Sequence, residues 1–271
     1  MKVFKFGGAS VKDAAGIKNV YDVLQKVGYE DVLLVVSAMG KTTNALEVVV
    51  KDYFQKSASL QSSIQEVKKY HNQILLDLFE DEKNSVFIAV NDLFADLDYF
   101  LNHNKSPNYN FVYDQIVSFG ELISTTILSH YMTYRGIKTN WIDVRNYIKT
   151  DVTYRDAEVD WETTQKCISK NVKRKVLNIT QGFLGSDENG FTTTLGREGS
   201  DYTAAIFAYC LNAESVTIWK DVPGVMNADP RYFENASLLN QISYREAIEL
   251  AFYGASVIHP KTLQPLQKKE I

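Results

Sequence analysis

The sequence is poor in cysteine, proline and histidine. Its 271 residues include two cysteines, five prolines and four histidines. Cys167 and Cys210 form neither a CxxC pair nor a metal-binding spacing with the histidines, which argues against a zinc site. Both cysteines fall in apolar helical patterns, so we expect two inert, buried thiols. Low cysteine usage is typical of a reducing compartment.

Long apolar runs and blocks of one charge are also missing. No stretch approaches the roughly 20 apolar residues that a membrane-spanning helix needs, and no signal-peptide pattern follows Met1. The 29 basic and 33 acidic residues are well mixed and give a net charge of −4, which argues against nucleic-acid binding. We therefore expect a cytoplasmic protein with neither nucleic-acid nor membrane partners.

The sequence does contain strand patterns that alternate with helix patterns. Hydrophobic residues make up 45% of the chain, which is enough for a substantial core. Residues 31–37 form an apolar, β-branched run typical of a strand buried on both faces of a parallel sheet. The alternation predicts one α/β/α unit over residues 1–271, with a mostly parallel sheet. Further predicted elements are strands at 3–6, 139–144, 176–180 and 215–220, a hairpin over 183–195, two or three helices covering one end of the sheet over 44–104, and helices over 115–135, near 161–173 and near residues 244 and 260.

Unusual residues follow the first predicted strand, at the end where parallel sheets bind ligands. Lys5 lies inside that strand, and Gly7, Gly8 and Ser10 follow it. Paired glycines let the backbone approach a ligand, and exposed amides beside an ammonium can cradle a phosphate. The spacing matches neither the P-loop nor GxGxxG. A tight turn with a solvent-facing lysine is the alternative, but an unpaired lysine is costly to bury.

Polar residues also end the second predicted strand, from Ser37 to Asn44. Thr43 or Asn44 can cap the helix that follows, and the same hydroxyls can hold a ligand carboxylate at the helix N-terminus.

Farther along, Glu121 falls on or near the buried face of an apolar helix. It is either a surface residue or the counter-charge of a substrate ammonium.

Two more motifs follow later strands. Arg197 is a candidate carboxylate clamp, and Ser200 or Asp201 can cap the next helix. Asp201 can instead orient a phosphate-binding lysine. Two cations and two carboxylates around the Pro-Gly turn at 223–224 indicate the edge of a nucleotide or metal–phosphate site. His259, just before Pro260, is interpreted as structural.

Together these motifs resemble those of the aspartate kinases, in the amino acid kinase family. The resemblance implies a three-layer α/β/α sandwich. It also implies transfer of the γ-phosphoryl group of ATP to the side-chain carboxylate of L-aspartate, giving 4-phospho-L-aspartate and ADP in lysine, threonine and methionine biosynthesis. No general base is required, because a carboxylate is already ionised at pH 7. The motifs are Lys5-Phe6-Gly7-Gly8 with Ser10, Val35-Val36-Ser37-Ala38, Ser118-Phe119-Gly120-Glu121, Gly196-Arg197 with Gly199-Ser200-Asp201, and Asp221-Val222-Pro223-Gly224 with Asp229-Pro230-Arg231.

The resemblance also implies a role for each site residue. Lys5 would stabilise the transferring phosphoryl group, and Asp201 would hold Lys5 in place. Mg²⁺ would bridge ATP phosphates, and a homodimer is the candidate assembly. The implied aspartate-binding residues are Thr43, Glu121, Arg197 and Ser200. The implied ATP-binding residues are Lys5, Gly7, Gly8, Ser10, Ser37, Lys220, Asp221, Met226, Arg231 and Ser256.

The sequence departs from the family pattern at several positions. Glu198 replaces a common glycine and adds negative charge beside an anion site. Ser256 stands where many relatives carry a nucleotide-binding lysine, and we hypothesise that Lys220 supplies the missing charge. The regulatory ACT domains usual in relatives are expected to be absent from this chain. The alternative functions are another amino acid kinase, acting on acetylglutamate, glutamate, carbamate or UMP, and a non-catalytic nucleotide-binding module.

Overall fold

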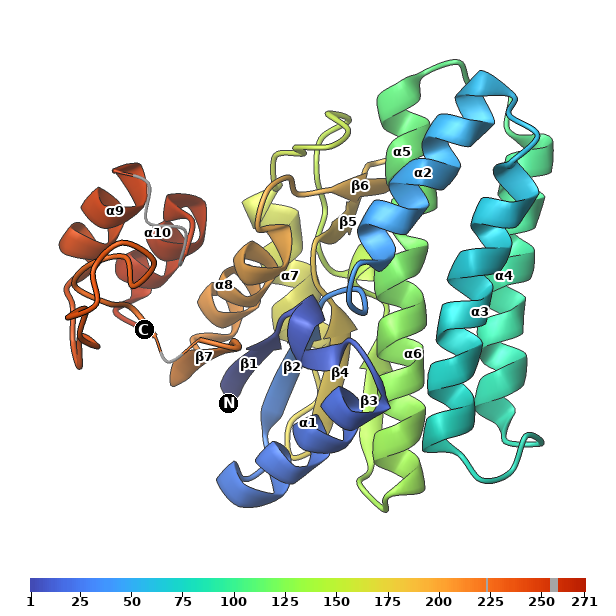
Figure 1. Ribbon diagram of the computed structural model, residues 1–271. Coiled ribbons are helices and arrows are strands. Elements are labelled where there is room, and N and C mark those ends of the chain that lie inside the picture. Colours follow the sequence, from blue (N-terminus) through green and yellow to red (C-terminus); the bar gives the residue numbers. More distant parts are fainter. Residues whose placement is uncertain (223, 254–257) are drawn as a thin grey trace.

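A five-stranded parallel sheet forms the centre of the protein in a computed structural model (Figure 1). The structure describes residues 1–222, 224–253 and 258–271. The strand order is β3-β4-β2-β1-β7, and every pairing in this sheet is parallel. The sheet agrees with the predicted α/β class. The strands are β1 Lys2–Phe6, β2 Val32–Val36, β3 Thr139–Ile142, β4 Leu177–Gln181 and β7 Ser215–Trp219.

Helices cover both faces of this sheet and complete the three layers. Helices α1 and α6 pack on one face and α8 on the other, with α7 and α10 against α8 (Figure 1). The predicted hairpin forms from β5 Leu184–Ser186 and β6 Thr192–Thr194. The helices are α1 Ala14–Val27, α2 Thr42–Gln55, α3 Leu60–Leu78, α4 Ser85–His103, α5 Tyr109–Val117, α6 Phe119–Tyr134, α7 Trp161–Asn171, α8 Gly199–Leu211, α9 Tyr244–Phe252 and α10 Pro260–Lys269, with short 3₁₀ helices η1 Gly8–Val11 and η2 Val144–Asn146.

The helices before β3 differ from the prediction in two respects. Helices α2, α3 and α4 do not cover an end of the sheet but form a further layer outside α5 and α6 (Figure 1). Helix α6 is apolar on nearly every side, so its face away from the sheet needs cover as well. The helix predicted over 115–135 is divided at Ser118, whose hydroxyl donates to the Gln115 carbonyl at 2.8 Å.

Alternation along β1 decides which layer each of its side chains meets. Phe4 and Phe6 belong to the core shared with α1 and α6, whereas Val3 belongs to the core shared with α8. Because successive side chains of a strand point to opposite faces, Lys5 shares the face of Val3. The lysine therefore points toward α8, where the only charged side chain of the helix is Asp201.

The chain after β7 is more exposed than the rest. Helix α9 begins with a capping box formed by Ser243 and Glu246, and none of its residues, all of which the structure describes, is buried. Helix α10 packs on α8 and is capped by His259, whose Nδ1 accepts from the Lys261 amide at 3.2 Å. This cap confirms the structural interpretation of His259.

The cysteines and the helix lengths can be compared with the predictions of inert thiols and of a protein without membrane-spanning helices. Both cysteines are free, but only Cys210 is buried, and Cys167 is partly exposed, so the prediction of two buried thiols is half right. Cys167 lies in α7, a surface helix that buries only Thr164 and Ile168. Within the described part of the chain, every helix is too short or too polar to cross a membrane.

Candidate functional site

A pocket of about 280 Å³ lies at the carboxyl ends of the central strands. It is formed by segments that are far apart in the sequence, as expected where parallel strands end side by side. Seven of the predicted site residues line it, namely Lys5, Ser37, Thr43, Glu121, Ser200, Asp201 and Lys220. The remaining lining residues are Phe183, Gly196, Glu198 and Gly199.

A buried ion pair joins β1 to α8. The Lys5 ammonium lies 2.6 Å from Asp201 Oδ1, and the two side chains are 8% and 3% exposed. Asp201 also lies 3.4 Å from the Lys220 ammonium through its Oδ2. A carboxylate in the first turn of a helix is favoured by the helix dipole. Of the two alternatives for Asp201, capping is excluded, since Glu198 occupies the N-cap without a side-chain hydrogen bond, and the contact with Lys5 favours the orienting role.

Glycines hold the first two loops together beside Lys5. A Cβ atom on Gly8 would lie 2.7 Å from the Ala38 carbonyl oxygen, so no larger residue fits there without movement. The Gly40 amide donates to the Gly8 carbonyl at 3.0 Å, and the Ser10 amide donates to the Gly7 carbonyl at 2.9 Å. A Cβ on Gly7 would lie 3.4 Å from the Lys5 ammonium. The Lys5 ammonium itself lines the pocket.

Glu121 is buried, which excludes the alternative that it is a surface residue. Its side chain accepts a hydrogen bond from the Ala38 amide at 3.2 Å through Oε1. Its Oε2 is buried and has no hydrogen-bond partner among the described residues. Burial raises the pKa of Glu121 to about 8. An unpartnered carboxylate oxygen in a pocket is ready to receive a proton or a cation.

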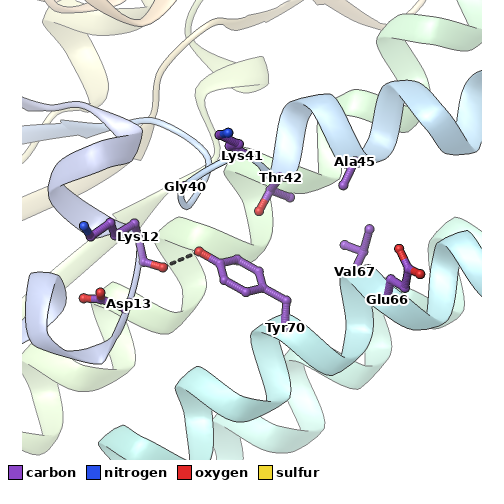
Figure 2. A pocket seen from close by; sticks show the side chains of 9 residues that line it. All are labelled: Lys12, Asp13, Gly40, Lys41, Thr42, Ala45, Glu66, Val67 and Tyr70. Atoms are coloured by element: carbon purple, nitrogen blue, oxygen red, sulfur yellow. Dashed lines mark hydrogen bonds between the residues drawn. The ribbon is translucent and has the colours of Figure 1, made fainter.

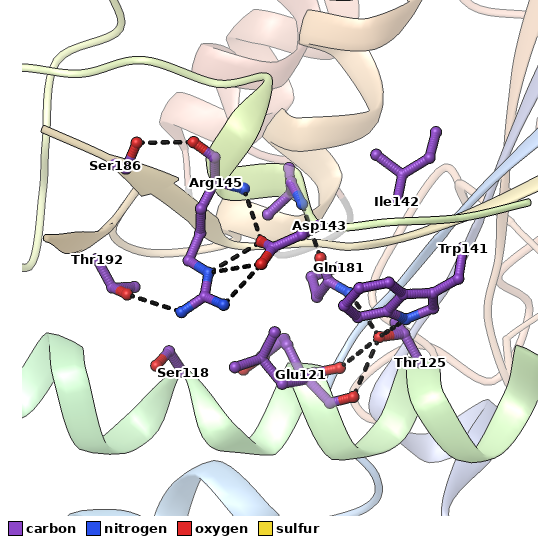
Figure 3. Close-up of polar contacts among 12 residues, drawn as sticks. Ser118, Glu121, Thr125, Trp141, Ile142, Asp143, Arg145, Gln181, Ser186 and Thr192 are labelled. Atoms are coloured by element: carbon purple, nitrogen blue, oxygen red, sulfur yellow. Dashed lines mark hydrogen bonds and ion pairs between the residues drawn. The ribbon is translucent and has the colours of Figure 1, made fainter. Parts of the chain in front are cut away.

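A polar network fixes the helix that carries Glu121 (Figure 3). The Gln181 side-chain amide donates to Thr125 Oγ1 at 2.7 Å and accepts from the Val144 amide at 2.8 Å. Thr125 Oγ1 donates to the Glu121 carbonyl at 2.9 Å and accepts from the Trp141 indole at 3.1 Å. These bonds fix α6 against the ends of β3 and β4. Together with the Ala38 amide, they hold the helix and the side-chain carboxylate of Glu121 in place.

The family of the chain follows from comparison with known proteins. The family model described as "Amino acid kinase family" matches residues 1–271. The chain belongs to the amino acid kinase family. This confirms the family and the fold that the motifs implied.

The most similar members of the family include aspartokinases. The chain is 35% identical to lysine-sensitive aspartokinase 3 of Escherichia coli over 280 residues, covering 99% of this chain and 60% of that protein. It is 32% identical to the chloroplastic bifunctional aspartokinase/homoserine dehydrogenase 2 of Arabidopsis thaliana over 279 residues, covering 99% of this chain and 30% of that protein. The chain thus spans 60% or less of the length of these relatives.

Solved structures of the family give the same result. Escherichia coli aspartokinase III in complex with aspartate and ADP superposes with a TM-score of 0.90 at 32% identity, covering 99% of this chain and 60% of that one. The aspartate kinase of Clostridium acetobutylicum superposes with a TM-score of 0.83 at 25% identity, covering 100% of this chain and 59% of that one.

Two pocket residues have a left-handed backbone, and the sequence reasoning missed one of them. Phe183 has φ 72° and Glu198 has φ 55°, and strained backbone of this kind is more frequent at functional sites than elsewhere. Phe183 follows Gly182, where a Cβ would lie 2.4 Å from that of Ser200. The sequence feature that could have pointed to Phe183 is Gly182, a glycine that comes directly after a fully buried strand. Glu198, noted only as a departure from the family, lies inside the pocket.

Several predicted residues lie outside this pocket. Arg197 and Asp221 are exposed and do not line it. Arg231 is exposed and pairs with Asp229 at 2.7 Å, and Met226 forms a β-bridge with Leu238. Ser256 lies outside the described residues.

The start of α2 also differs from its prediction. The helix begins at Thr42, and Lys41 occupies the N-cap without a side-chain hydrogen bond, so neither Thr43 nor Asn44 is the cap. The Thr42 hydroxyl donates instead to the Met39 carbonyl at 2.6 Å. This leaves Thr43 at the pocket wall, where its side chain is available to a ligand.

A larger cavity, of about 480 Å³, lies behind the Gly40 turn (Figure 2). Tyr70 of α3 forms one wall, and its hydroxyl donates to the Lys12 carbonyl. A Cβ on Gly40 would lie 2.6 Å from that hydroxyl, so the glycine lets α3 hold the loop. Of the predicted site residues that the structure describes, none lines this cavity. The predicted site residues therefore favour the smaller pocket as the functional site.

Proposed function

We propose that residues 1–271 form an aspartate kinase catalytic unit, which transfers the γ-phosphoryl group of ATP to the side-chain carboxylate of L-aspartate. The observation that carries this proposal is the pocket that joins the Lys5–Asp201 ion pair to the buried carboxylate of Glu121. L-Aspartate carries an ammonium group that can pair with Glu121. Its two carboxylates can accept hydrogen bonds from the hydroxyls and pair with the cations of this pocket. The similarity to aspartokinases, one of them bound to aspartate and ADP, supports aspartate over other substrates.

Substrate binding follows from the charges in the pocket. The ammonium of aspartate binds the Glu121 oxygen that has no partner in the described chain, and it displaces a proton from that carboxyl group. Thr43 and Ser200 line the pocket and donate hydroxyl hydrogen bonds to substrate carboxylate oxygens. Arg197 clamps a carboxylate by turning inward from its exposed position beside the pocket.

Phosphoryl transfer needs positioning and charge neutralisation rather than a base. A side-chain carboxylate oxygen of aspartate attacks the γ-phosphorus. The bond from that phosphorus to the bridging oxygen breaks, and its electron pair leaves with ADP. Lys5 stabilises the charge on the transferring group. Asp201 acts as a positioning residue, since it holds the Lys5 ammonium at 2.6 Å.

The nucleotide phosphates would lie along the glycine turn and the end of β7. Of the predicted ATP-binding residues, Ser37 and Lys220 line the pocket. Gly7, Gly8 and Ser10 would contact the phosphates from the loop beside Lys5, and Asp221, Met226 and Arg231 would border the rest of ATP. Within the described residues, no group of three or more His, Cys, Asp or Glu side chains is placed to hold a metal. Mg²⁺ would neutralise charge on the phosphate oxygens of the nucleotide. A cytoplasmic location and a homodimer stay predictions.

The proposal is tested by turnover in hydroxylamine, which traps an acyl phosphate as a coloured hydroxamate. The purified chain is incubated with ATP, Mg²⁺ and L-aspartate, beside Lys5→Ala and Lys2→Ala. Lys2 is the matched control, because it lies in the same strand but pairs with Glu214 at 3.8 Å and is 45% exposed. We expect aspartate-dependent hydroxamate from the wild type and from Lys2→Ala, and none from Lys5→Ala. Equal product from Lys5→Ala and the wild type would rule out Lys5 as the group that stabilises the transferred phosphoryl group.

A further inference from the structure

Helix α5 carries a buried carboxylate, that of Asp114, which does not line the pocket. Its Oδ2 accepts hydrogen bonds from the Thr194 amide at 2.8 Å and from the Arg155 amide at 2.9 Å. Its Oδ1 accepts a third hydrogen bond, from the Thr194 hydroxyl at 2.8 Å. Burial raises the pKa of this carboxyl group to about 6, so it is mostly ionised at pH 7.

The hydrogen bonds of Asp114 join α5 to two other segments. Thr194 is the last residue of β6, and Arg155 belongs to the loop between η2 and α7. The Arg155 guanidinium also lies 4.2 Å from the ring centroid of Tyr113, the residue before Asp114. The Ala157 amide then donates to the Thr194 carbonyl at 2.9 Å. Helix α5 thus fixes this loop and the end of β6 against each other.

The residues that follow β6 form one wall of the pocket and include Arg197, the proposed carboxylate clamp. The Leu195 amide donates to the Phe183 carbonyl at 2.9 Å, and Phe183 lines the pocket as well. A Cβ atom on Gly196 would lie 2.4 Å from Asp156 Oδ1, so the wall packs closely against the loop that Asp114 holds. A shift of that loop or of the end of β6 would therefore move the wall.

We infer that Asp114 is a positioning residue for aspartate recognition, because it fixes the segment that brings Arg197 to a substrate carboxylate. The inference rests on the proposed function. Side chains that bind a substrate need such support, since a small displacement of a binding group weakens its contact. The alternative is that Asp114 only stabilises the fold. In that case its loss would lower the melting temperature without a selective effect on aspartate.

The test compares variants that keep or remove the hydrogen bonds of Asp114. Asp114→Asn keeps one carbonyl oxygen for both backbone amides, and its NH₂ group can donate to the Thr194 hydroxyl, which can accept as well as donate. Asp114→Ala leaves both amides without this acceptor. Thr192→Val is the matched control, because Thr192 lies in the same strand but its hydroxyl contacts the Arg145 guanidinium, at 3.3 Å. Thermal unfolding establishes which variants are folded.

We expect the KM for L-aspartate to rise about tenfold or more in Asp114→Ala, because the clamp is misplaced. The kcat and the calorimetric affinity for ADP should stay nearly unchanged, and Asp114→Asn and Thr192→Val should resemble the wild type. Where Asp114→Ala does not fold, Asp114→Glu replaces it. That side chain keeps the charge but is one methylene longer, so it should displace the segment and raise the same KM.

A wild-type KM in folded Asp114→Ala or Asp114→Glu overturns the inference, and so does an equal weakening of aspartate and ADP binding. Hydrogen exchange gives a measurement without aspartate. The Leu195 and Gly199 amides, which are hydrogen-bonded in the wall, should exchange faster in the folded variant than in the wild type or Thr192→Val, and unchanged exchange overturns the inference. A wild-type chain that forms no aspartyl hydroxamate contradicts the proposed function alone.

Discussion

The core beside the pocket and the chain that follows β7 are built in different ways. Helix α8, which carries Asp201, buries every residue except Tyr209, and β4 is buried at each of its five positions. By contrast, β7 is half-buried throughout, and α9 has no buried residue among its nine, all described. The proposed amino acid end of the site therefore lies in the core, whereas Lys220 and the chain after β7, which carry several of the predicted nucleotide contacts, lie at the surface.

This difference predicts how the two ends respond to substitution. Residues at the amino acid end hold one another in place inside a low-dielectric region, so a change there affects both stability and rate. Exposed residues of the chain after β7, such as Arg231, have few contacts, so a change there should affect binding of the nucleotide more than stability.

The largest effect is expected for Asp201→Asn, which leaves the buried Lys5 ammonium without its carboxylate. We expect a loss of about 3–5 kcal/mol in the free energy of unfolding and of about 10²–10³-fold in kcat. Urea unfolding and the hydroxamate assay measure the two effects. Asp156→Asn is the control, because its ion pair with Lys261 involves a side chain that is 73% exposed. A similar stability loss in both variants would contradict the contrast between core and surface.

The next effect concerns the pH dependence of aspartate binding. Burial raises the pKa of Glu121 to about 8, so the carboxyl group of the free site is mostly protonated at pH 7. Aspartate binds the ionised form, and its KM should therefore fall as pH rises from 6.5 to 8.5. In Glu121→Gln, the KM should be raised about tenfold or more, because a charged hydrogen bond is lost, and the fall with pH should disappear. A parallel fall in both proteins would show that another group titrates.

The same pKa predicts the pH dependence of stability. The folded protein binds the Glu121 proton more tightly than the unfolded chain does, so folding is favoured while that proton is retained. This contribution is fully present below the ordinary glutamate pKa of about 4.5 and is lost as pH rises through about 8. Urea unfolding at pH 6 and pH 9 should show a smaller decrease in Glu121→Gln than in the wild type.

Glu198→Gly tests the left-handed backbone at the boundary between the two ends. Glycine removes a strain of about 1 kcal/mol at φ 55°, so the melting temperature should rise. It also removes a negative charge from the pocket, so the KM for ATP should fall. Lys56→Gly is matched, since Lys56 has φ 48° at the end of α2. It should raise the melting temperature with no change in KM, and an equal KM change in both would exclude the charge effect.

The smallest effect is expected for Arg231→Ala. Arg231 is exposed and pairs with Asp229 at the surface, where an ion pair contributes little to stability. The melting temperature should stay unchanged, while the KM for ATP should rise if the side chain borders the nucleotide as proposed. A clear drop in melting temperature would show that this segment is more tightly packed than its exposure indicates.

Hydrophobic periodicity predicted most of the helices and strands. It did not predict features set by tertiary contacts, such as the arrangement of the helical layers and where helices begin. The apolar run at 31–37 and the hairpin turn residues predicted β2 and the β5–β6 hairpin, since burial and turn chemistry are local signals. The outer helical layer was missed, because helical spacing shows that a face is apolar without showing what covers it. Capping by Thr43 or Asn44 and by Ser200 or Asp201, one of two alternatives at each helix start, does not occur, because the backbone starts each helix at another residue.

The site was predictable where residue type conflicts with environment. Lys5 in an apolar strand and Glu121 in an apolar helix stand out from their neighbours, and both lie in the pocket. Phe183 was missed because a phenylalanine after a buried strand is ordinary, and its φ of 72° exists only in the fold. The exposed positions of Arg197 and Arg231 have no comparable sequence signal.

Substrate choice tests the central claim most directly. ADP release is measured with L-aspartate, L-glutamate, N-acetyl-L-glutamate and UMP at equal concentrations. The account predicts turnover with L-aspartate and negligible turnover with N-acetyl-L-glutamate, which lacks the ammonium that Glu121 binds. Equal or faster turnover with the acetylated substrate or with UMP would contradict the assignment of this pocket to aspartate.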